Sequence, residues 1–347
     1  MPRERGGHAL ATRTAEPEPA VEQEGVRARV FDADRTDRLL PFDDALKARI
    51  SARQLLWIDI VGELTPDQRG ALAERFELES DTEGALGAQR SGPSLELHGQ
   101  HFHVRVAAEP DPKHPRDSTW LDLIAGSDLV ISRHDRPLGF LDALNERIKA
   151  DASIGELDSP EFVASVLDGV VTSYHAAIDA IEDELDAHDA RTLSRPRSDG
   201  DAIGQLVAIR RRVAQLRRLL AVHREVFGAL SRPGFVRGVS PDNPEVFLPV
   251  SSRFDAALAA AESARELVVS SFDVLMTRTA QRTNDVMRAL TLITVLGLPA
   301  TITAGFLGMN VIVPVSKDDP TSFWIIAGLV IVLELVLVVV ARMKRWI

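Results

Sequence analysis

The side chains best placed to handle ions lie on and just beyond an uncharged apolar stretch near the C-terminus. Asn310 follows this stretch, residues 289–307, in the sequence Gly308-Met309-Asn310. Counting back from Asn310 by helical repeats gives one stripe of hydroxyl, amide and apolar side chains: Thr301, Leu298, Thr294, Leu290 or Thr291, Met287 and Asn284. The polar members could meet ions, and the apolar members predict a constriction that closes by losing water. The other faces are apolar too, so periodicity alone leaves the choice of face open.

A second apolar stretch, residues 323–341, contains a single charged residue, Glu334. A charge in the middle of a membrane costs ~3 kcal/mol or more. Three interpretations stay open: the side chain is protonated, it is bonded to a threonine of the first stretch, or it has a role in proton coupling.

Three histidines, His98, His101 and His103, lie close together in the soluble part. On a strand, His101 and His103 would share a face and could hold Zn²⁺. Glu96 is the one obvious further ligand nearby. We therefore expect an exposed strand of the soluble domain here rather than a metal site.

Motifs of common enzyme classes are absent from the sequence. The 347 residues contain no GxxxxGK[ST], GxGxxG, HExxH or GxSxG pattern and no cysteine, which excludes disulfides, thiolate metal sites and cysteine nucleophiles. A net charge of −11 argues against nucleic acid as a partner. A pump would need a nucleotide site or a redox centre. We therefore expect a protein that is not an enzyme and needs no cofactor.

Both apolar stretches have the length of membrane-spanning helices. Residues 289–307 and 323–341 would each be ~28 Å long as a helix, which matches the ~30 Å hydrocarbon core of a bilayer. Pro299 is tolerable in such a helix, because neighbouring groups can satisfy the freed carbonyl. Two helices cannot enclose a pore, so transport would require several copies of the chain.

The distribution of basic residues predicts the orientation. Arginines precede the first span and the tail 342–347 is basic, whereas the connecting loop 308–322 has one lysine against Asp318 and Asp319. We therefore expect both termini in the cytoplasm, the loop outside, and a location in the inner membrane. The two aspartates could concentrate cations, although a solvated loop is the simpler interpretation. Residues 1–25 resemble a disordered tail rather than a signal peptide.

The fold class predicted for residues 26–155 is a cytoplasmic α/β domain. Thr65 can cap a helix over 65–76 and Pro66 suits its first position, and a further helix is expected over 137–150. Strands are expected at 27–33, 54–62, 95–97, 101–107, 119–125 and 128–133.

Long helices are expected after residue 155. Residues 156–240 predict a hairpin of an acidic helix (161–190) and an arginine-rich helix (199–230). Antiparallel pairing would let acid face base in ion pairs, and an acidic surface that attracts cations is the alternative. Residues 241–288 predict a stalk helix that continues into the first span without a stop signal and has one apolar face.

The sequence of residues 281–310, QRTNDVMRALTLITVLGLPATITAGFLGMN, resembles the CorA-type divalent-cation channels of the CorA/ZntB superfamily. The likeness continues more loosely through the second span and the basic tail, and the order of α/β domain, hairpin and stalk is similar. The resemblance implies a funnel-shaped homopentamer whose first spans line the pore. Gly308, Met309 and Asn310 would form its outer mouth and meet hydrated Mg²⁺, which gives up its water reluctantly.

The resemblance also assigns individual positions. The family's pore-lining positions fall on Asn310, Thr301, Leu298, Leu290, Met287 and Asn284. Asp273 coincides with an acidic stalk position and is a candidate metal ligand. The family's regulatory stalk carboxylate falls near Pro249 by offset, where this sequence has no acid.

These observations predict a pentameric channel for uptake of Mg²⁺, and for Co²⁺ or Ni²⁺, driven by the membrane potential. The first alternative is a Zn²⁺ transporter of the same fold, coupled to protons through Glu334. The second is a membrane-anchored sensor or scaffold, which would need neither Asn310 nor the polar stripe.

Overall fold

The computed structural model describes residues 25–32, 37–51, 53–87, 92–99, 101–114, 117–150, 158–194, 199–235, 243–308 and 320–343. The predicted N-terminal tail, apart from Gly25, lies outside these residues, as do Met309, Asn310 and the end of the basic tail. The chain divides into two compact units, Met1–Asp186 with Val207–Leu267 and Ala187–Leu206 with Val268–Ile347.

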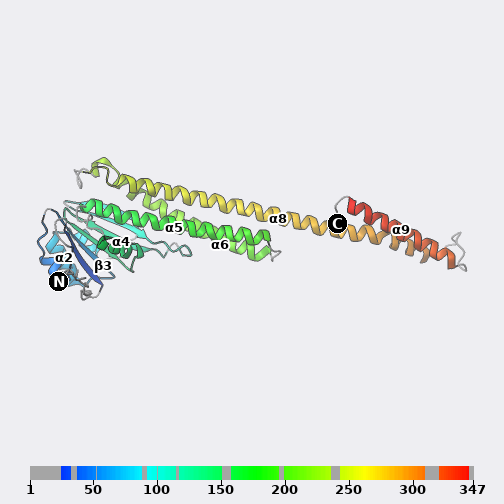
Figure 1. Cartoon of the computed structure of the whole chain (residues 1–347), viewed down its shortest axis with the longest axis horizontal. Helices are drawn as coiled ribbons and strands as arrows, with labels where there is room; N and C mark the ends of the chain where they lie inside the picture. Colours follow the sequence, from blue (N-terminus) through cyan, green and yellow to red (C-terminus); the bar gives the residue numbers. More distant parts are fainter. Residues whose placement is uncertain are drawn as a thin grey trace, which may run out of the picture. The chain divides into compact units, whose positions relative to one another are not determined.

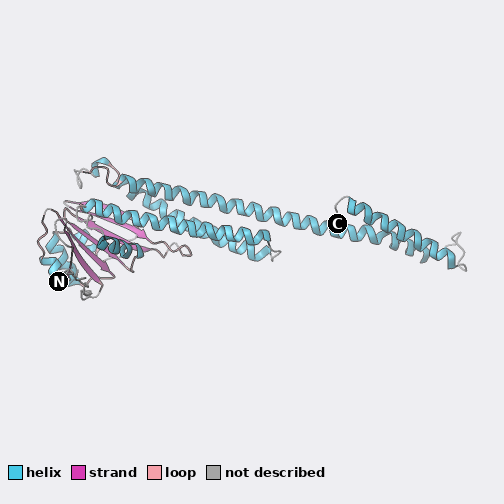
Figure 2. Cartoon of the chain, in the orientation of Figure 1, coloured by secondary structure: helices cyan, strands magenta, loops and turns pink. Residues whose placement is uncertain are grey.

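A seven-stranded mixed sheet is the framework of the α/β domain (Figures 1 and 2). Its order is β2-β1-β3-β7-β6-β5-β4, with β3 and β7 parallel and the other neighbours antiparallel. The strands are β1 (Val26–Asp32), β2 (Arg38–Leu40), β3 (Gln54–Val61), β4 (Ser94–His98), β5 (His101–Ala108), β6 (Thr119–Ala125) and β7 (Leu129–His134). The strand predictions are confirmed to within a few residues.

Short helices connect the strands, and long helices follow them. They are α1 (Phe42–Lys47), α2 (Pro66–Phe76), α3 (Ser80–Ala85), α4 (Gly139–Ala150), α5 (Ser159–Ser194), α6 (Asp199–Leu230), α8 (Leu248–Gly308) and α9 (Pro320–Met343). Helix α2 begins as predicted. The Gln68 N–H donates to Thr65 Oγ1 over 3.3 Å, while the Thr65 N–H donates to the Gln68 side chain. This capping box satisfies two N–H groups that the helix itself leaves unpaired.

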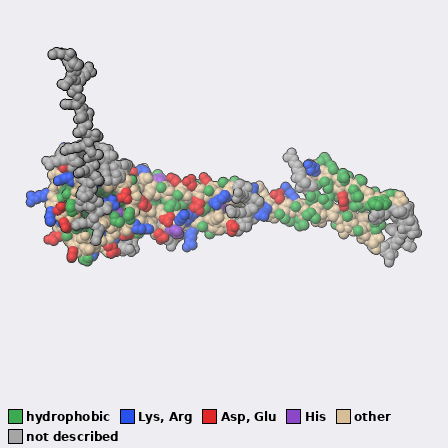
Figure 3. Space-filling model, turned by 60° about the horizontal axis from the view of Figure 1, so that its bottom comes forward, with side chains coloured by type: hydrophobic (Ala, Val, Ile, Leu, Met, Phe, Trp, Pro, Cys, Tyr) green, Lys and Arg blue, Asp and Glu red, His purple; other side chains and the backbone are tan. Residues whose placement is uncertain are grey.

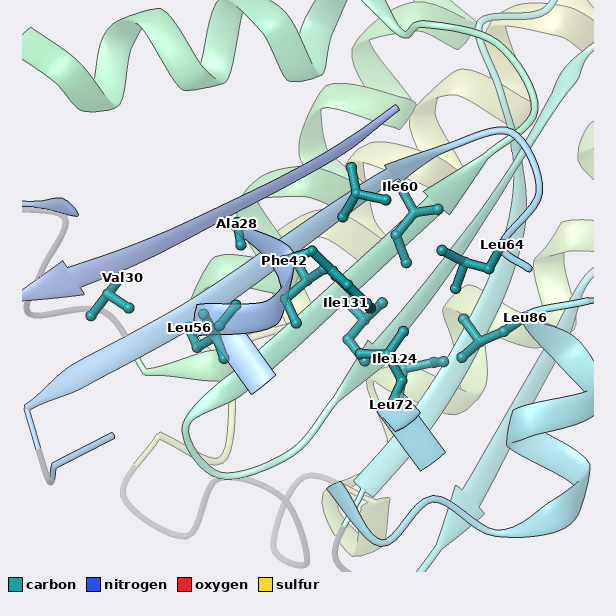
Figure 4. Packing of buried hydrophobic residues seen from close by; sticks show 13 residues of the cluster. Ala28, Val30, Phe42, Leu56, Ile60, Leu64, Leu72, Leu86, Ile124 and Ile131 are labelled. Atoms are coloured by element: carbon teal, nitrogen blue, oxygen red, sulfur yellow. The ribbon is translucent and has the colours of Figure 1, made fainter. Parts of the chain in front are cut away.

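One face of the sheet forms a hydrophobic core with α1, α2 and α3 (Figure 4). The sheet contributes a row of aliphatic side chains and the helices cover it with Phe42, Leu72 and Leu86. The sheet residues of this cluster are Val26, Ala28, Val30, Leu56, Ile58, Ile60, Ile124 and Ile131. The cluster residues of β1 and of β3 are two positions apart in the sequence, because successive side chains of a strand point to opposite faces of the sheet. This spacing explains why these segments form strands rather than helices.

Helix α5 packs against the opposite face of the sheet. The Phe162 ring lies 5.6 Å from that of Phe31 and 5.2 Å from that of Trp57, centroid to centroid. Further along α5, the buried Tyr174 hydroxyl donates to the Ala107 carbonyl. These contacts bury aromatic area and satisfy the one polar atom of Tyr174.

The predicted hairpin and stalk are confirmed as helices. Helix α8 is a single helix of 61 residues. Its apolar face is buried through Phe254, Ala261, Ala264, Val268 and Leu275. The expected ion pairing between the two helices of the hairpin is found in one pair, because Arg212 of α6 lies 2.7 Å from Glu184 of α5. Arg217 of α6 instead pairs with Glu262 of α8.

Candidate membrane pore and soluble-domain clusters

Two helices are long and apolar enough to cross a membrane. Helix α8 contains an apolar stretch that the rest of the chain does not bury, and the apolar segment Trp324–Met343 of α9 is almost entirely unburied as well. In the face that Figure 3 shows, hydrophobic side chains concentrate on these helices, whereas charged side chains spread over the other coloured parts. The core helix of a soluble protein would be mostly covered by its own chain, and these two apolar stretches are not.

The predicted stripe lies on the continuous helix α8, which ends at Gly308. Its apolar members Leu298, Leu290 and Met287 are 54%, 56% and 57% exposed. Thr301, Thr294 and Asn284 are exposed as well. The stripe is therefore available to face either lipid or other copies of the helix, and its assignment to a pore stays a prediction.

The threonine hydroxyls of the stripe are oriented by their own helix. Thr301 Oγ1 donates to the Gly297 carbonyl over 2.8 Å, and Thr294 Oγ1 donates to the Leu290 carbonyl over 2.9 Å. A hydroxyl that has donated its hydrogen still offers oxygen lone pairs. Each threonine thus presents an acceptor, which is the group that a hydrated cation needs.

Neither of the two candidate carboxylates is part of a closed metal site. Asp273 is exposed on α8, and Glu334 is half-buried on α9. Among the described residues, no group of three or more histidine, aspartate or glutamate side chains is placed to hold a metal ion.

The histidines occupy a different environment from the predicted one. His101 and His103 share a face of the sheet, but every residue of β5 is buried, so the expectation of an exposed strand is wrong. The physical reason is that β5 pairs with a strand on each side and that Tyr174 of α5 and His223 of α6 bond to the backbone of its Ala107. His103 Nε2 lies 2.9 Å from Asp122 Oδ1, and His98 Nδ1 lies 3.1 Å from Glu79 Oε2.

Asp122 also holds two arginines, which the sequence analysis did not identify. Its Oδ2 lies 2.5 Å from Arg105 Nη1 and 3.5 Å from Arg133 Nη1, and all of these side chains are buried. The one sequence feature that could have indicated this cluster is the presence of charged residues on otherwise apolar strands. The arrangement is a structural ion-pair cluster at the centre of the sheet.

Comparison with known proteins decides the family. The sequence pattern of the family described as "CorA-like Mg2+ transporter protein" matches residues 52–345. The chain belongs to this family. The CorA-like chain is 22% identical over 324 residues to the cobalt/magnesium transport protein CorA of Thermotoga maritima. The aligned segment covers 92% of this chain and 89% of the relative. It is 30% identical over 211 residues to the divalent cation transporter CmaX of Pseudomonas aeruginosa, which covers 61% and 62%.

Solved structures show the same fold over nearly the whole CorA-like chain. The full-length CmaX structure matches with a TM-score of 0.69 at 25% identity, covering 94% of this chain and 100% of that one. The complete CorA structure from Methanocaldococcus jannaschii matches with a TM-score of 0.70 at 19% identity, with the same coverage. The predicted fold of an α/β domain, long helices and C-terminal apolar helices is confirmed. The protein is thus a divalent cation transporter of the CorA family, which is a family of membrane-embedded transporters.

Proposed function

We propose that the protein is a homopentameric channel of the inner membrane that takes up Mg²⁺, with both termini in the cytoplasm. One observation carries the proposal. In a member of the CorA-like Mg²⁺ transporter family, α8 runs unbroken from the soluble domain through an uncharged segment and ends at Gly308, the first residue of Gly-Met-Asn.

In this proposal the ion is selected while it is still hydrated. Mg²⁺ holds its water shell tightly, so a ring of Asn310 amide oxygens would accept hydrogen bonds from that shell rather than replace it. A ring of carboxylates would bind a divalent ion more tightly and slow its release. Gly308 would let the backbone turn at the mouth, and Met309 would pack beside it.

Below the mouth, the stripe on α8 would alternate between polar and apolar levels. Thr301 and Thr294 would offer oxygen acceptors, while Leu298, Leu290 and Met287 would form the constriction that closes by losing water. Asn284 would add an amide level at the inner end.

Several copies would be needed because the two membrane helices of one chain cannot enclose a pore. The number five follows from the family resemblance. Asp273 is exposed on the stalk and would be free to contribute to a metal site formed with a neighbouring copy. The membrane potential would supply ~2.3 kcal/mol per charge per 100 mV, or roughly 4.6 kcal/mol for a divalent ion.

The test is ion flux into proteoliposomes that contain the purified protein and a Mg²⁺-sensitive dye. An inside-negative potential should drive Mg²⁺ entry, and adding Co²⁺ or Ni²⁺ should compete with it. Absence of any metal flux from a well-folded oligomer would contradict the channel and favour the sensor or scaffold.

A second candidate rests on Glu334, a half-buried carboxyl group in the middle of α9. An ionisable side chain at this depth is costly and is often part of a proton pathway. This candidate is a proton-coupled Zn²⁺ transporter of the same fold. Zn²⁺ entry that follows an imposed pH gradient rather than the potential would favour it.

A further inference from the structure

We propose that the α/β domain binds a small organic cation with an apolar body, in a cavity at one end of its sheet. The cavity measures about 560 Å³, within the range of small-molecule sites. Its walls are the C-terminal end of α2, the segment between α2 and α3, the turn between β4 and β5, and the turn between β6 and β7. None of its residues lies on α8 or α9, so the proposal is independent of the ion pathway.

The floor of the cavity borders the hydrophobic core. Leu56 and Ile124 are fully buried core residues that line it, and Figure 4 shows both within the core cluster. The neighbouring apolar side chains pack on the same core but are only partly buried, and they also line the cavity: Ile50, Phe76, Leu78 and Leu129. An apolar ligand would remove this surface from water, which is favourable.

The rim of the cavity is acidic. Glu77, Glu79 and Asp128 line it, and Arg75 is the one lysine or arginine among the lining residues. The Arg75 guanidinium is already engaged, because Nε donates to the Leu46 carbonyl over 2.7 Å and Nη2 to the Ala48 carbonyl over 2.9 Å. Partial burial raises the pKa of Asp128. A cationic group above the apolar floor would complement this charge.

Two histidines line the cavity, and His98 contacts the rim carboxylate Glu79. His98 lies between two carboxylates, 3.1 Å from Glu79 and 3.2 Å from Glu96. Burial, followed by the nearby His98, lowers the pKa of His101, which is therefore uncharged at neutral pH. The His98 and His101 rings stack with centroids 5.6 Å apart and form one side of the cavity.

A metal ion fits this cavity less well than an organic cation. No three histidine, aspartate or glutamate side chains of the described residues converge on a common point. The apolar floor also offers nothing to a bare ion. The apolar floor and the acidic rim together favour a ligand that is charged at one end and apolar at the other.

The test is calorimetric titration of the full-length protein in detergent with three ligands of the same shape. Benzamidine is a cation, benzamide is neutral and benzoate is an anion. Benzamidine should bind at least about tenfold more tightly than benzamide, because an ionic contact is worth more than a neutral one, and benzoate should not bind. Equal affinities for benzamidine and benzamide, or no binding of either, would overturn the proposal.

Two double variants locate the site. Glu77→Gln with Asp128→Asn should weaken benzamidine binding about tenfold or more and bring it toward that of benzamide. Glu74→Gln with Asp111→Asn removes two carboxylates outside the cavity and should leave binding unchanged. Unchanged melting temperatures would show that both variants are folded. Wild-type affinity in the folded cavity variant would overturn the proposed position.

Discussion

His223 of α6 accepts a hydrogen bond at Nε2 from the backbone N–H of Ala107 in β5, 2.9 Å away. Its Nδ1–H donates to the Leu219 carbonyl over 2.6 Å, which fixes the neutral tautomer. Ala107 lies beyond Arg105, the last residue of β5 that pairs with β4. The imidazole thus supplies the partner that no strand provides at this point, and it joins α6 to the sheet.

This relationship predicts a loss of stability in mild acid. Burial lowers the pKa of His223 from 6.5 to about 4. Between these pH values the unfolded chain binds the proton and the folded chain does not, so the free energy of unfolding falls as the pH drops from about 6.5 to 4. The full loss would be roughly 3 kcal/mol. Melting temperatures at pH 7 and pH 5 should differ less in His223→Gln than in the wild type or in the exposed-site control His114→Gln. An undiminished pH effect in His223→Gln would contradict this assignment.

Removing the carboxylate of Asp122 should be severely destabilising. Asp122→Asn would leave the buried guanidinium groups of Arg105 and Arg133 without their common counter-charge. Breaking a buried pair by removing one partner costs roughly 3–5 kcal/mol. The surface pair of Asp142 with Arg27 is the control, and Asp142→Asn should cost about 1 kcal/mol or less. Chemical denaturation of both variants would measure this difference, and similar small losses would argue against a buried ion-pair cluster.

The contact between α5 and α4 should not tolerate a methyl group at Gly169. A Cβ placed there would lie 2.5 Å from Cδ2 of Phe140. Gly169→Ala should therefore destabilise the protein by roughly 1–3 kcal/mol. Gly228 of α6 has no atom within 4 Å of such a Cβ, and Gly228→Ala should be neutral or stabilising by up to about 1 kcal/mol. Thermal unfolding that ranks the two variants the other way round would contradict the packing.

The elements of the fold were predictable wherever the signal is local. The bounds expected for the arginine-rich helix, 199–230, agree with α6, and the capping role expected of Thr65 is confirmed. The unbroken passage from stalk to first span follows from the absence of proline and glycine between residue 251 and Gly297. Each of these features depends on residues within a few turns of one another.

The polar clusters were not predictable, because their members are distant in the sequence. Ala107 and His223 are 116 residues apart, and Glu79 lies 19 residues from His98. Whether a histidine on a strand is exposed depends on which strands and helices cover it, and no local pattern gives that. For the candidate pore, the key residue predicted from the sequence is Asn310, which lies outside the described residues.

Glu334 distinguishes the two transport mechanisms. In the potential-driven Mg²⁺ channel, Glu334→Gln should keep at least about half of the flux, since a neutral amide of the same shape can make similar hydrogen bonds and an uncharged group suits the membrane. In the proton-coupled alternative, the same change should abolish the response to a pH gradient. Parallel flux assays with a potential and with a pH gradient separate these outcomes.

The proposed channel passes Mg²⁺ across the membrane through a ring of Asn310 side chains. The most direct measurement compares potential-driven Mg²⁺ flux in proteoliposomes for the wild type, Asn310→Ala and Thr303→Ala. Thr303 is the control because it lies on α8 outside the predicted stripe and its hydroxyl donates to the Pro299 carbonyl. We expect a loss of at least about tenfold in Asn310→Ala, because an ordered acceptor is removed, and near-normal flux in Thr303→Ala. Equal flux in all three proteins, at equal amounts of folded oligomer, would contradict it.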